Sequence, residues 1–217
     1  MLREDAIFSW TRTKQTDGVE NTIKLSVRRM KAEDIPVVAA LERECFAEAW
    51  SENAIAESFS DPNYLFFVVT TSLLTASVLP ASLSTASQLP VAKSLDEPEA
   101  HQTSSDVTQI SSDMKERDSE QVVGYVGAYL AVDELSITNV AVFSSYRRCG
   151  VADGLMKALN LFATERNLYG ITLEVRVSNS AAIALYEKNG YEKSGIRKGF
   201  YSKPKEDALI MWKYFQQ

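Results

Sequence analysis

A short run of basic and small residues, Arg147-Arg148-Cys149-Gly150-Val151-Ala152, stands between a predicted strand and a predicted helix. The start of a helix presents unpaired backbone N–H groups and the positive end of the helix dipole. A glycine there lets a phosphate approach the backbone, and the two arginines add positive charge. The run therefore predicts a cradle for a diphosphate, although an ordinary strand-to-helix turn with surface arginines explains it equally well. It matches neither G-x-x-x-x-G-K-S/T nor G-x-G-x-x-G.

The histidine and cysteine content argues against several other kinds of site. The chain has one histidine, His101, and two cysteines, Cys45 and Cys149, which stand far apart in the sequence. Zinc sites built from His and Cys, Ser–His–Asp triads and disulfide frameworks are all disfavoured by these counts. We therefore expect chemistry without a metal and without histidine.

Several motifs in series carry a resemblance to a known family. Arg-x-x-Gly-x-Ala at the start of a helix after a long strand resembles the acetyl-CoA signature of GNAT-fold N-acetyltransferases. Further segments are similar to the RimI-type enzymes within it: Asn139-Val-Ala-Val142, Leu173-Glu-Val-Arg-Val-Ser-Asn179, Ala181-Ala-Ile-Ala-Leu-Tyr-Glu187, Gly190-Tyr191 and Glu206-Asp-Ala-Leu-Ile-Met211. The resemblance covers about 122–215 closely and 23–69 more loosely. It implies transfer of an acetyl group from acetyl-CoA to the N-terminal alanine of small-subunit ribosomal protein number eighteen.

The resemblance also implies where the coenzyme binds. Its pantetheine arm would pair with the backbone of the strand segment Val140, Ala141 and Val142. Its diphosphate would lie on backbone amides at the predicted helix start, namely those of Arg148, Cys149, Gly150, Val151, Ala152 and Asp153. Asn179 would contact the coenzyme as well. Position 149 often holds glutamine in the subgroup, a departure that is harmless if only the backbone amide is used.

Two residues receive acid–base roles from the resemblance. Tyr186 is implied to protonate the leaving thiolate, and Glu174 to accept the proton of the amine, directly or through water. From spacing alone, Tyr186 is a packed aromatic residue of an amphipathic helix. Glu174 is then a solvated strand residue or the ion-pair partner of Arg176.

The acceptor site is implied by two further segments, in which Tyr201 is the first candidate for peptide contact and Trp50 the second. Both could equally be packing residues, and Phe200 stands where the subgroup often has tyrosine. An α-amino group with a pKa of about 8 is roughly a tenth neutral at pH 7, whereas lysine is only about 0.04% neutral. A single carboxylate base therefore favours an N-terminal amine over a lysine side chain.

Other functions stay open at this point. The same fold could acetylate a polyamine, an amino sugar or a lysine side chain. It could also be an acetyl-CoA-binding interaction module without catalysis. We expect no direct nucleic-acid binding from a net charge of −6, no membrane span, cytoplasmic residence and a monomer or weak oligomer.

The elements that position these residues follow from hydrophobic periodicity and capping signals. We predict strands at 23–30, 64–69, 122–129, 134–142, 171–177, 191–197 and 208–214. We predict four helices: one that begins at Ala32, one capped by Ser51 that runs to about Phe59, one that follows Ala152 and is ended by Asn167 and Gly170, and one that stops at Asn189-Gly190. Ser51 and either Ser178 or Asn179 are the expected N-caps. The fold class is α/β, a GNAT acyl-CoA N-acyltransferase fold with helices on both faces of a central mixed sheet.

Composition divides the chain. Residues 71–120 hold 16 Ser or Thr and half of the prolines, but none of the 21 aromatic residues. Such a segment has little apolar surface to offset its ordering entropy, so we predict a flexible insertion there. It carries eight acids and three bases, a charge of −5, which leaves −6 − (−5) = −1 for the other 167 residues. We therefore expect a loose extension over 1–22 and a single domain over 23–217, interrupted at about 71–120.

Overall fold

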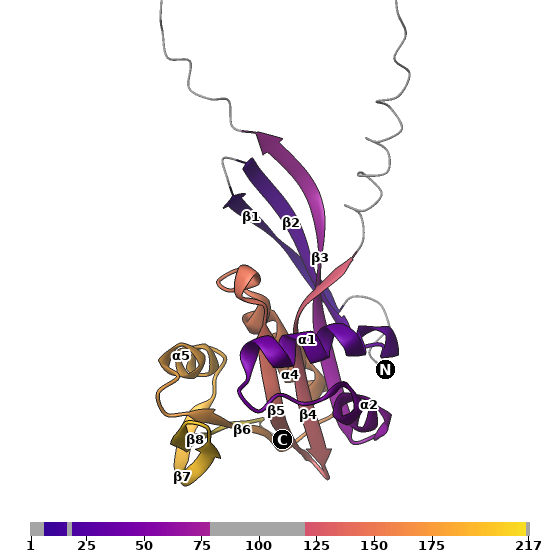
Figure 1. The fold of residues 1–217 in the computed structure, drawn as a ribbon. Coiled ribbons are helices and arrows are strands. Elements are labelled where there is room, and N and C mark those ends of the chain that lie inside the picture. Colours follow the sequence, from indigo (N-terminus) through magenta and orange to yellow (C-terminus); the bar gives the residue numbers. More distant parts are fainter. Residues whose placement is uncertain (1–6, 17–18, 79–119, 216–217) are drawn as a thin grey trace, which may run out of the picture.

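The computed structural model describes residues 7–16, 19–78 and 120–215, which form one eight-stranded sheet with helices packed on it (Figure 1). The strand order is β1-β2-β3-β4-β5-β6-β8-β7, and only the β5–β6 pair is parallel. The elements are β1 (Phe8–Thr16), β2 (Val19–Arg29), α1 (Ile35–Cys45), α2 (Glu52–Ser60), β3 (Tyr64–Val78), β4 (Gln121–Ala131), β5 (Glu134–Val142), α4 (Val151–Glu165), β6 (Gly170–Arg176), α5 (Ser180–Lys188), β7 (Glu192–Ser202) and β8 (Lys205–Tyr214). The predicted mixed sheet is confirmed.

Helices cover both faces of the sheet, as predicted. One core cluster joins the buried side of α4 to alternate residues of the strands, such as Phe67, Leu135 and Leu173. The other joins α1 and α2 to the intervening residues, such as Phe66 and Val68. Because successive strand residues point to opposite faces, β3 contributes to both clusters in turn.

The loose extension predicted over 1–22 is wrong for the part that the structure describes. Phe8–Thr16 forms β1, which pairs with β2 from Phe8↔Val27 to Thr16↔Val19. The segment was missed because it is rich in polar residues, with only Phe8 and Trp10 as large apolar side chains. Asp17-Gly18, a dipeptide typical of two-residue hairpin turns, was the signal that could have predicted the pairing.

The predicted insertion begins too early in the sequence. Residues 71–78 belong to β3, where their backbone pairs with β2 as far as Val19↔Val78. Polar residues are interspersed with apolar ones in this strand segment, and it still pairs because main-chain hydrogen bonds do not require apolar side chains. Residues 79–119, which include His101, lie outside the described residues.

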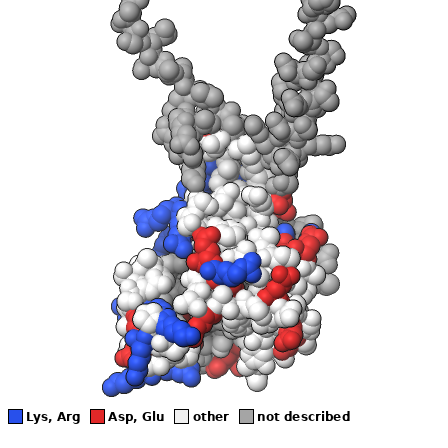
Figure 2. All heavy atoms as spheres, viewed as in Figure 1, with Lys and Arg blue, Asp and Glu red and all other residues white. Residues whose placement is uncertain are grey.

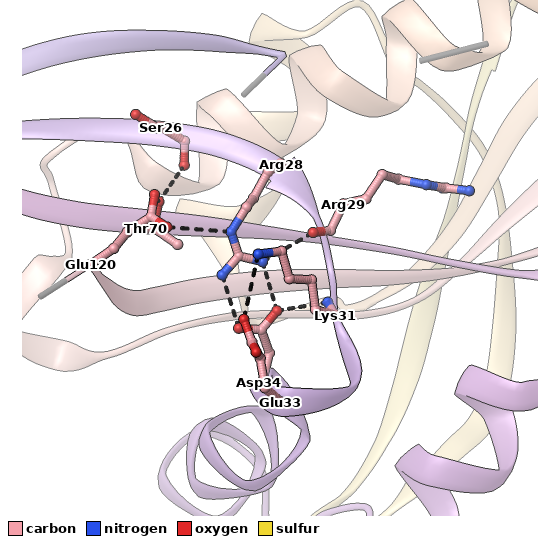
Figure 3. A network of polar contacts seen from close by, with 8 residues as sticks. All are labelled: Ser26, Arg28, Arg29, Lys31, Glu33, Asp34, Thr70 and Glu120. Atoms are coloured by element: carbon pink, nitrogen blue, oxygen red, sulfur yellow. Dashed lines mark hydrogen bonds and ion pairs between the residues drawn. The ribbon is translucent and has the colours of Figure 1, made fainter. Parts of the chain in front are cut away.

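A polar network holds the chain where the described structure resumes at Glu120 (Figure 3). The Thr70 hydroxyl donates to Glu120 Oε1 at 2.5 Å, and Arg28 Nε lies 3.6 Å from Glu120 Oε2. The same guanidinium donates two hydrogen bonds to the buried carboxylate of Asp34, at 2.7 and 2.9 Å. A bidentate contact of this kind is geometrically specific, so it fixes β2 against the start of α1. The contact with Glu120 joins β2 to the residue that precedes β4.

No helix within the described residues is long and apolar enough to cross a membrane.

Candidate active site

A gap opens in the sheet between β5 and β6. The two strands pair only from Glu134↔Gly170 to Ile137↔Leu173. β5 then continues to Val142 with β4 as its partner, across a bulge between Gly127 and Ala128. Because a bulge bends and twists its strand, it is a physical cause for the divergence of β5 from β6.

Backbone groups of β5 face this gap. Phe143 N–H donates to the carbonyl of Val123 at 3.1 Å, which fixes the hydrogen-bonding phase of the β4–β5 ladder. Since alternate pairs of an antiparallel ladder exchange hydrogen bonds, Ala141 bonds to β4. The N–H and C=O groups of Val140 and Val142 therefore point toward the gap. The Val142 carbonyl accepts a weak hydrogen bond from the thiol of Cys45 at 3.6 Å.

The opposite side of the gap is lined by β6. Val177 N–H donates to the carbonyl of Asp207 at 3.3 Å, which sets the phase of the β6–β8 ladder. By the same alternation, the N–H and C=O of Glu174 point away from β8 and into the gap. The Tyr201 hydroxyl donates to this Glu174 carbonyl at 3.2 Å. Tyr201, a predicted site residue, is thus brought to the gap from β7.

The side chain of Glu174 lies on the face of the sheet covered by α1 and α2, since its neighbours Leu173 and Val175 belong to the core on the α4 face. Its carboxylate is paired with Arg197 at 3.1 Å. The alternative partner predicted for it, Arg176, is wrong: Arg176 pairs with Glu206 at 3.0 Å.

Tyr186 approaches from the other face. It lies on α5, is 7% exposed and belongs to the core cluster on the α4 face. Burial raises the pKa of its hydroxyl well above the ordinary value of 10, and the nearby Tyr201 raises it further. The hydroxyl therefore stays protonated throughout the physiological pH range and can only act as a proton donor there.

The run Arg148–Asp153 forms the loop into α4, as predicted. Gly150 is the N-cap residue with φ 85°, in the left-handed region that favours glycine, and Arg148 has φ 65°. The amides of Val151, Ala152 and Asp153 fall in the first turn of α4, which has no preceding turn to accept their hydrogen bonds. The carboxylate of Asp153 is offset by two lysines, Lys157 and Lys188, both at 3.0 Å.

Two residues of β1 that sequence reasoning missed contact the same loop. Trp10 Nε1 and Arg12 Nε both donate to the carbonyl of Cys149, at 3.1 and 3.4 Å. They were missed because β1 itself was not predicted. Their two-residue spacing on a strand places both side chains on one face, toward α4.

Asn179, the predicted coenzyme contact, is the N-cap residue of α5. Its side-chain oxygen accepts the amide of Ala182 at 3.1 Å, which confirms the predicted capping role. The equivalent prediction for Ser51 at α2 is also confirmed, with Ala54 as the donor. Asn179 is exposed, whereas Tyr186 is buried.

A buried carboxyl group that no sequence pattern indicated supports the turn between α1 and α2. Glu42 is 0% exposed and accepts hydrogen bonds from three elements. Its Oε1 accepts from the Tyr125 hydroxyl and from Asn139 Nδ2, the latter at 2.9 Å. Its Oε2 accepts from the backbone N–H of Trp50 at 2.8 Å. Trp50, a predicted acceptor residue, is thereby tied to β4 and β5 beside the gap.

Residues directly beside the two segments predicted to hold the acceptor, Ala49-Trp50-Ser51 and Arg197-Lys198-Gly199-Phe200-Tyr201, are in contact. The Ser202 hydroxyl, at the end of β7, donates to the Glu48 carboxylate at 2.9 Å, and Lys203 lies 3.8 Å from it. Figure 2 shows basic side chains gathered over the β7–β8 hairpin. That hairpin carries Lys193, Arg197, Lys198, Lys203 and Lys205. Glu48 in the turn after α1 is therefore in contact with the end of the basic β7–β8 hairpin.

In the part of the chain that is described, no group of three or more His, Cys, Asp or Glu side chains is placed to hold a metal ion.

Comparisons with known proteins agree with this geometry. Residues 88–191 match the Acetyltransferase (GNAT) family. A Bacillus subtilis (strain 168) protein, provisionally named a ribosomal protein bS18-alanine N-acetyltransferase, is 27% identical over 189 residues, which cover 87% of this chain and 95% of that protein. The Haemophilus influenzae ribosomal protein bS18-alanine N-acetyltransferase is 35% identical over 43% of this chain and 66% of its own length. The crystal structure of the Escherichia coli ribosomal-protein-S18-alanine N-acetyltransferase has the same fold, with a TM-score of 0.61 and 23% identity over 89% of this chain and 95% of that one.

Proposed function

Because the chain carries a GNAT-family acetyltransferase domain, we propose that it moves the acetyl group of acetyl-CoA to the N-terminal α-amino group of a protein. The observation that carries the proposal is the gap between β5 and β6, which has gap-facing backbone groups of β5 on one side and Glu174 with Tyr201 on the other. The substrate that its relatives suggest is the N-terminal alanine of ribosomal protein bS18. Such a substrate is made in the cytoplasm, where we expect the enzyme to act.

The residues around the gap fit acetyl-CoA. The gap-facing N–H and C=O groups of Val140 and Val142 match the amide groups of a pantetheine arm, as an added strand would. The loop into α4 offers amides, a glycine and the exposed side chains of Arg147 and Arg148 to a diphosphate. When bound, the coenzyme supplies an activated acetyl group as a thioester. The N–H of Val140 is suitably placed to polarise its carbonyl.

Glu174 is our candidate for the base that accepts the proton of the attacking amine. Its carboxylate is paired with Arg197, whose side chain is 58% exposed. Exposed ion pairs contribute little free energy, so an incoming N-terminal amine can compete with this contact. Glu174 then takes the proton that the nitrogen loses as the new C–N bond forms.

Tyr186 is our candidate for the acid that protonates the departing thiolate. Its hydroxyl is buried on the α4 face and keeps its proton because burial raises its pKa. As the carbon–sulfur bond breaks, negative charge develops on sulfur, and the phenol proton can move to it. One proton leaves the amine and another reaches the thiolate, so the step is balanced.

The most direct test compares two short peptides in an acetyl-CoA assay. One begins with free alanine, and the other begins with blocked alanine and holds an internal lysine. We expect only the first to be acetylated, with the new mass on its N-terminus. Acetylation of only the blocked peptide would overturn the N-terminal assignment. Acetylation of spermidine or of an amino sugar in preference to both peptides would favour a small-molecule amine acetyltransferase instead.

A further inference from the structure

The additional N-terminal strand β1 reaches the loop that begins α4. Trp10 Nε1 and Arg12 Nε converge on one acceptor, the carbonyl of Cys149, directly before the helix. A carbonyl held in this way fixes the orientation of the following peptide unit, because the peptide bond is planar. The amide of Gly150 belongs to that unit, so β1 determines how the loop presents its first N–H.

Glycines stand where β1 approaches the start of α4, at Gly150 before the helix and at Gly154 in its first turns. A Cβ added to Gly150 would stand 3.4 Å from Trp10 Nε1 and 3.7 Å from Arg12 Nη2. One added to Gly154 would stand 2.5 Å from the Trp10 ring, closer than such atoms can approach. The Trp10 indole therefore occupies a space that exists only because α4 has glycine at this position.

We infer that β1 is part of the coenzyme site: Arg12 binds the diphosphate of acetyl-CoA, and Trp10 is a positioning residue for the loop into α4. The inference deepens the proposed function and rests on it. Arg12 is exposed, and its guanidinium donates to the Cys149 carbonyl through Nε. Its remaining N–H donors lie beside Gly150, at the positive end of α4. A phosphate bound there would contact the Arg12 guanidinium and the start of the helix together.

The simpler reading is that Arg12 is an ordinary surface residue of an edge strand. That reading predicts no effect of the Arg12 charge on ligand binding, whereas ours predicts an effect confined to ligands that contain the diphosphate. Lys24 offers a matched control. It is an exposed cation on β2 opposite Thr11, so it lies on the same ribbon as Arg12 but points to the other face.

The experiment measures dissociation constants of CoA, dephospho-CoA and S-acetylpantetheine by calorimetry for the full chain and for Arg12→Ala, Arg12→Lys and Lys24→Ala. We expect Arg12→Ala to weaken CoA and dephospho-CoA alike by roughly threefold to tenfold, as for one exposed charge-assisted contact, with partial recovery in Arg12→Lys. S-acetylpantetheine should bind all variants equally, and the loss should shrink at high salt.

Three results would overturn the inference: unchanged CoA affinity in Arg12→Ala, an equal loss in Lys24→Ala, or an equal loss of S-acetylpantetheine binding. A loss that vanishes with dephospho-CoA would refute the diphosphate assignment. Trp10→Phe keeps the ring but removes its donor, and should weaken CoA while the melting temperature stays within a few degrees of the wild type. If the wild-type chain itself binds no CoA, the proposed function fails, a result distinct from failure of the Arg12 contact.

Discussion

The buried carboxyl group of Glu42 makes a sharp prediction about the acceptor side of the gap. Glu42→Gln keeps the size of the side chain but replaces one acceptor oxygen with a donor NH2 group. In one orientation this NH2 faces the N–H of Trp50, whose contact with Glu42 is now 2.8 Å. In the other it faces the side-chain amide of Asn139 and the hydroxyl of Tyr125. Either arrangement leaves at least one donor without its acceptor.

The magnitude follows from that single lost contact. A buried donor left unsatisfied costs about 1–3 kcal/mol. For a domain of this size, a loss of about 2 kcal/mol lowers the melting temperature by roughly 4–8 °C. Because the affected donor in the first orientation is the backbone of Trp50, the turn between α1 and α2 should loosen. We therefore expect the KM for an alanine-initiated peptide to rise severalfold while CoA affinity is unchanged.

The assay is thermal unfolding together with peptide kinetics, and Glu44→Gln is the matched control. Glu44 lies on the same helix but is exposed, and it accepts from the backbone amide and the side chain of Ser144, which a glutamine oxygen can also do. The control should behave as the wild type in both measurements. A wild-type melting temperature in Glu42→Gln would refute the claim that its carboxyl group is needed as an acceptor for three donors. A lowered melting temperature with an unchanged KM would refute the link from Glu42 through Trp50 to peptide binding.

Two further predictions concern the proton transfers and alkaline stability. Glu174→Gln and Tyr186→Phe should each lower kcat by about a hundredfold or more, with CoA affinity kept within about twofold by calorimetry; wild-type turnover in either variant would remove that residue from the mechanism. Burial raises the pKa of Tyr125, Tyr186 and Tyr191 above 10 in the folded state. Their contribution to stability is therefore complete below about pH 10, the unfolded pKa, and is lost as pH rises above it. Absorbance at 295 nm should show these tyrosines ionising only with unfolding, and early ionisation of all nine tyrosines would contradict this.

Much of the C-terminal half could be predicted from sequence because its signals are local. β5 was predicted with its observed bounds. Residue type and position identified Ser51 as a cap and narrowed the other cap to Ser178 or Asn179, of which the structure has Asn179. Helix periodicity and capping depend on neighbours within a few residues, so one sequence contains them. β1 was not predicted because its contacts with β2 and α4 stabilise it, and its own sequence contains few apolar residues.

The sequence resemblance proposes a set of site residues, but it could not predict their geometry. The gap depends on where β5 and β6 stop pairing, which depends in turn on a bulge in the β4–β5 ladder. The ion-pair partner of Glu174 was misjudged because Arg197 reaches it from β7, two strands away in the sheet order. Glu42 was not selected because its contacts also join residues far apart in the sequence: its three donors come from positions 50, 125 and 139.

The placement of the two proton-transferring candidates on opposite faces bears on the kind of mechanism. Glu174 points to the α1 and α2 face, where Trp50 and the β7–β8 hairpin flank the proposed acceptor side. Tyr186 is buried in the cluster on the α4 face, the side on which the loop into α4 lies. An intact sheet would separate them, because paired strands leave no passage between neighbouring backbones. Since β5 and β6 diverge just where Val140 and Glu174 lie, an amine from one face and a thioester from the other can meet within the sheet. Direct transfer needs only this meeting, with no acetyl group carried by the protein in between.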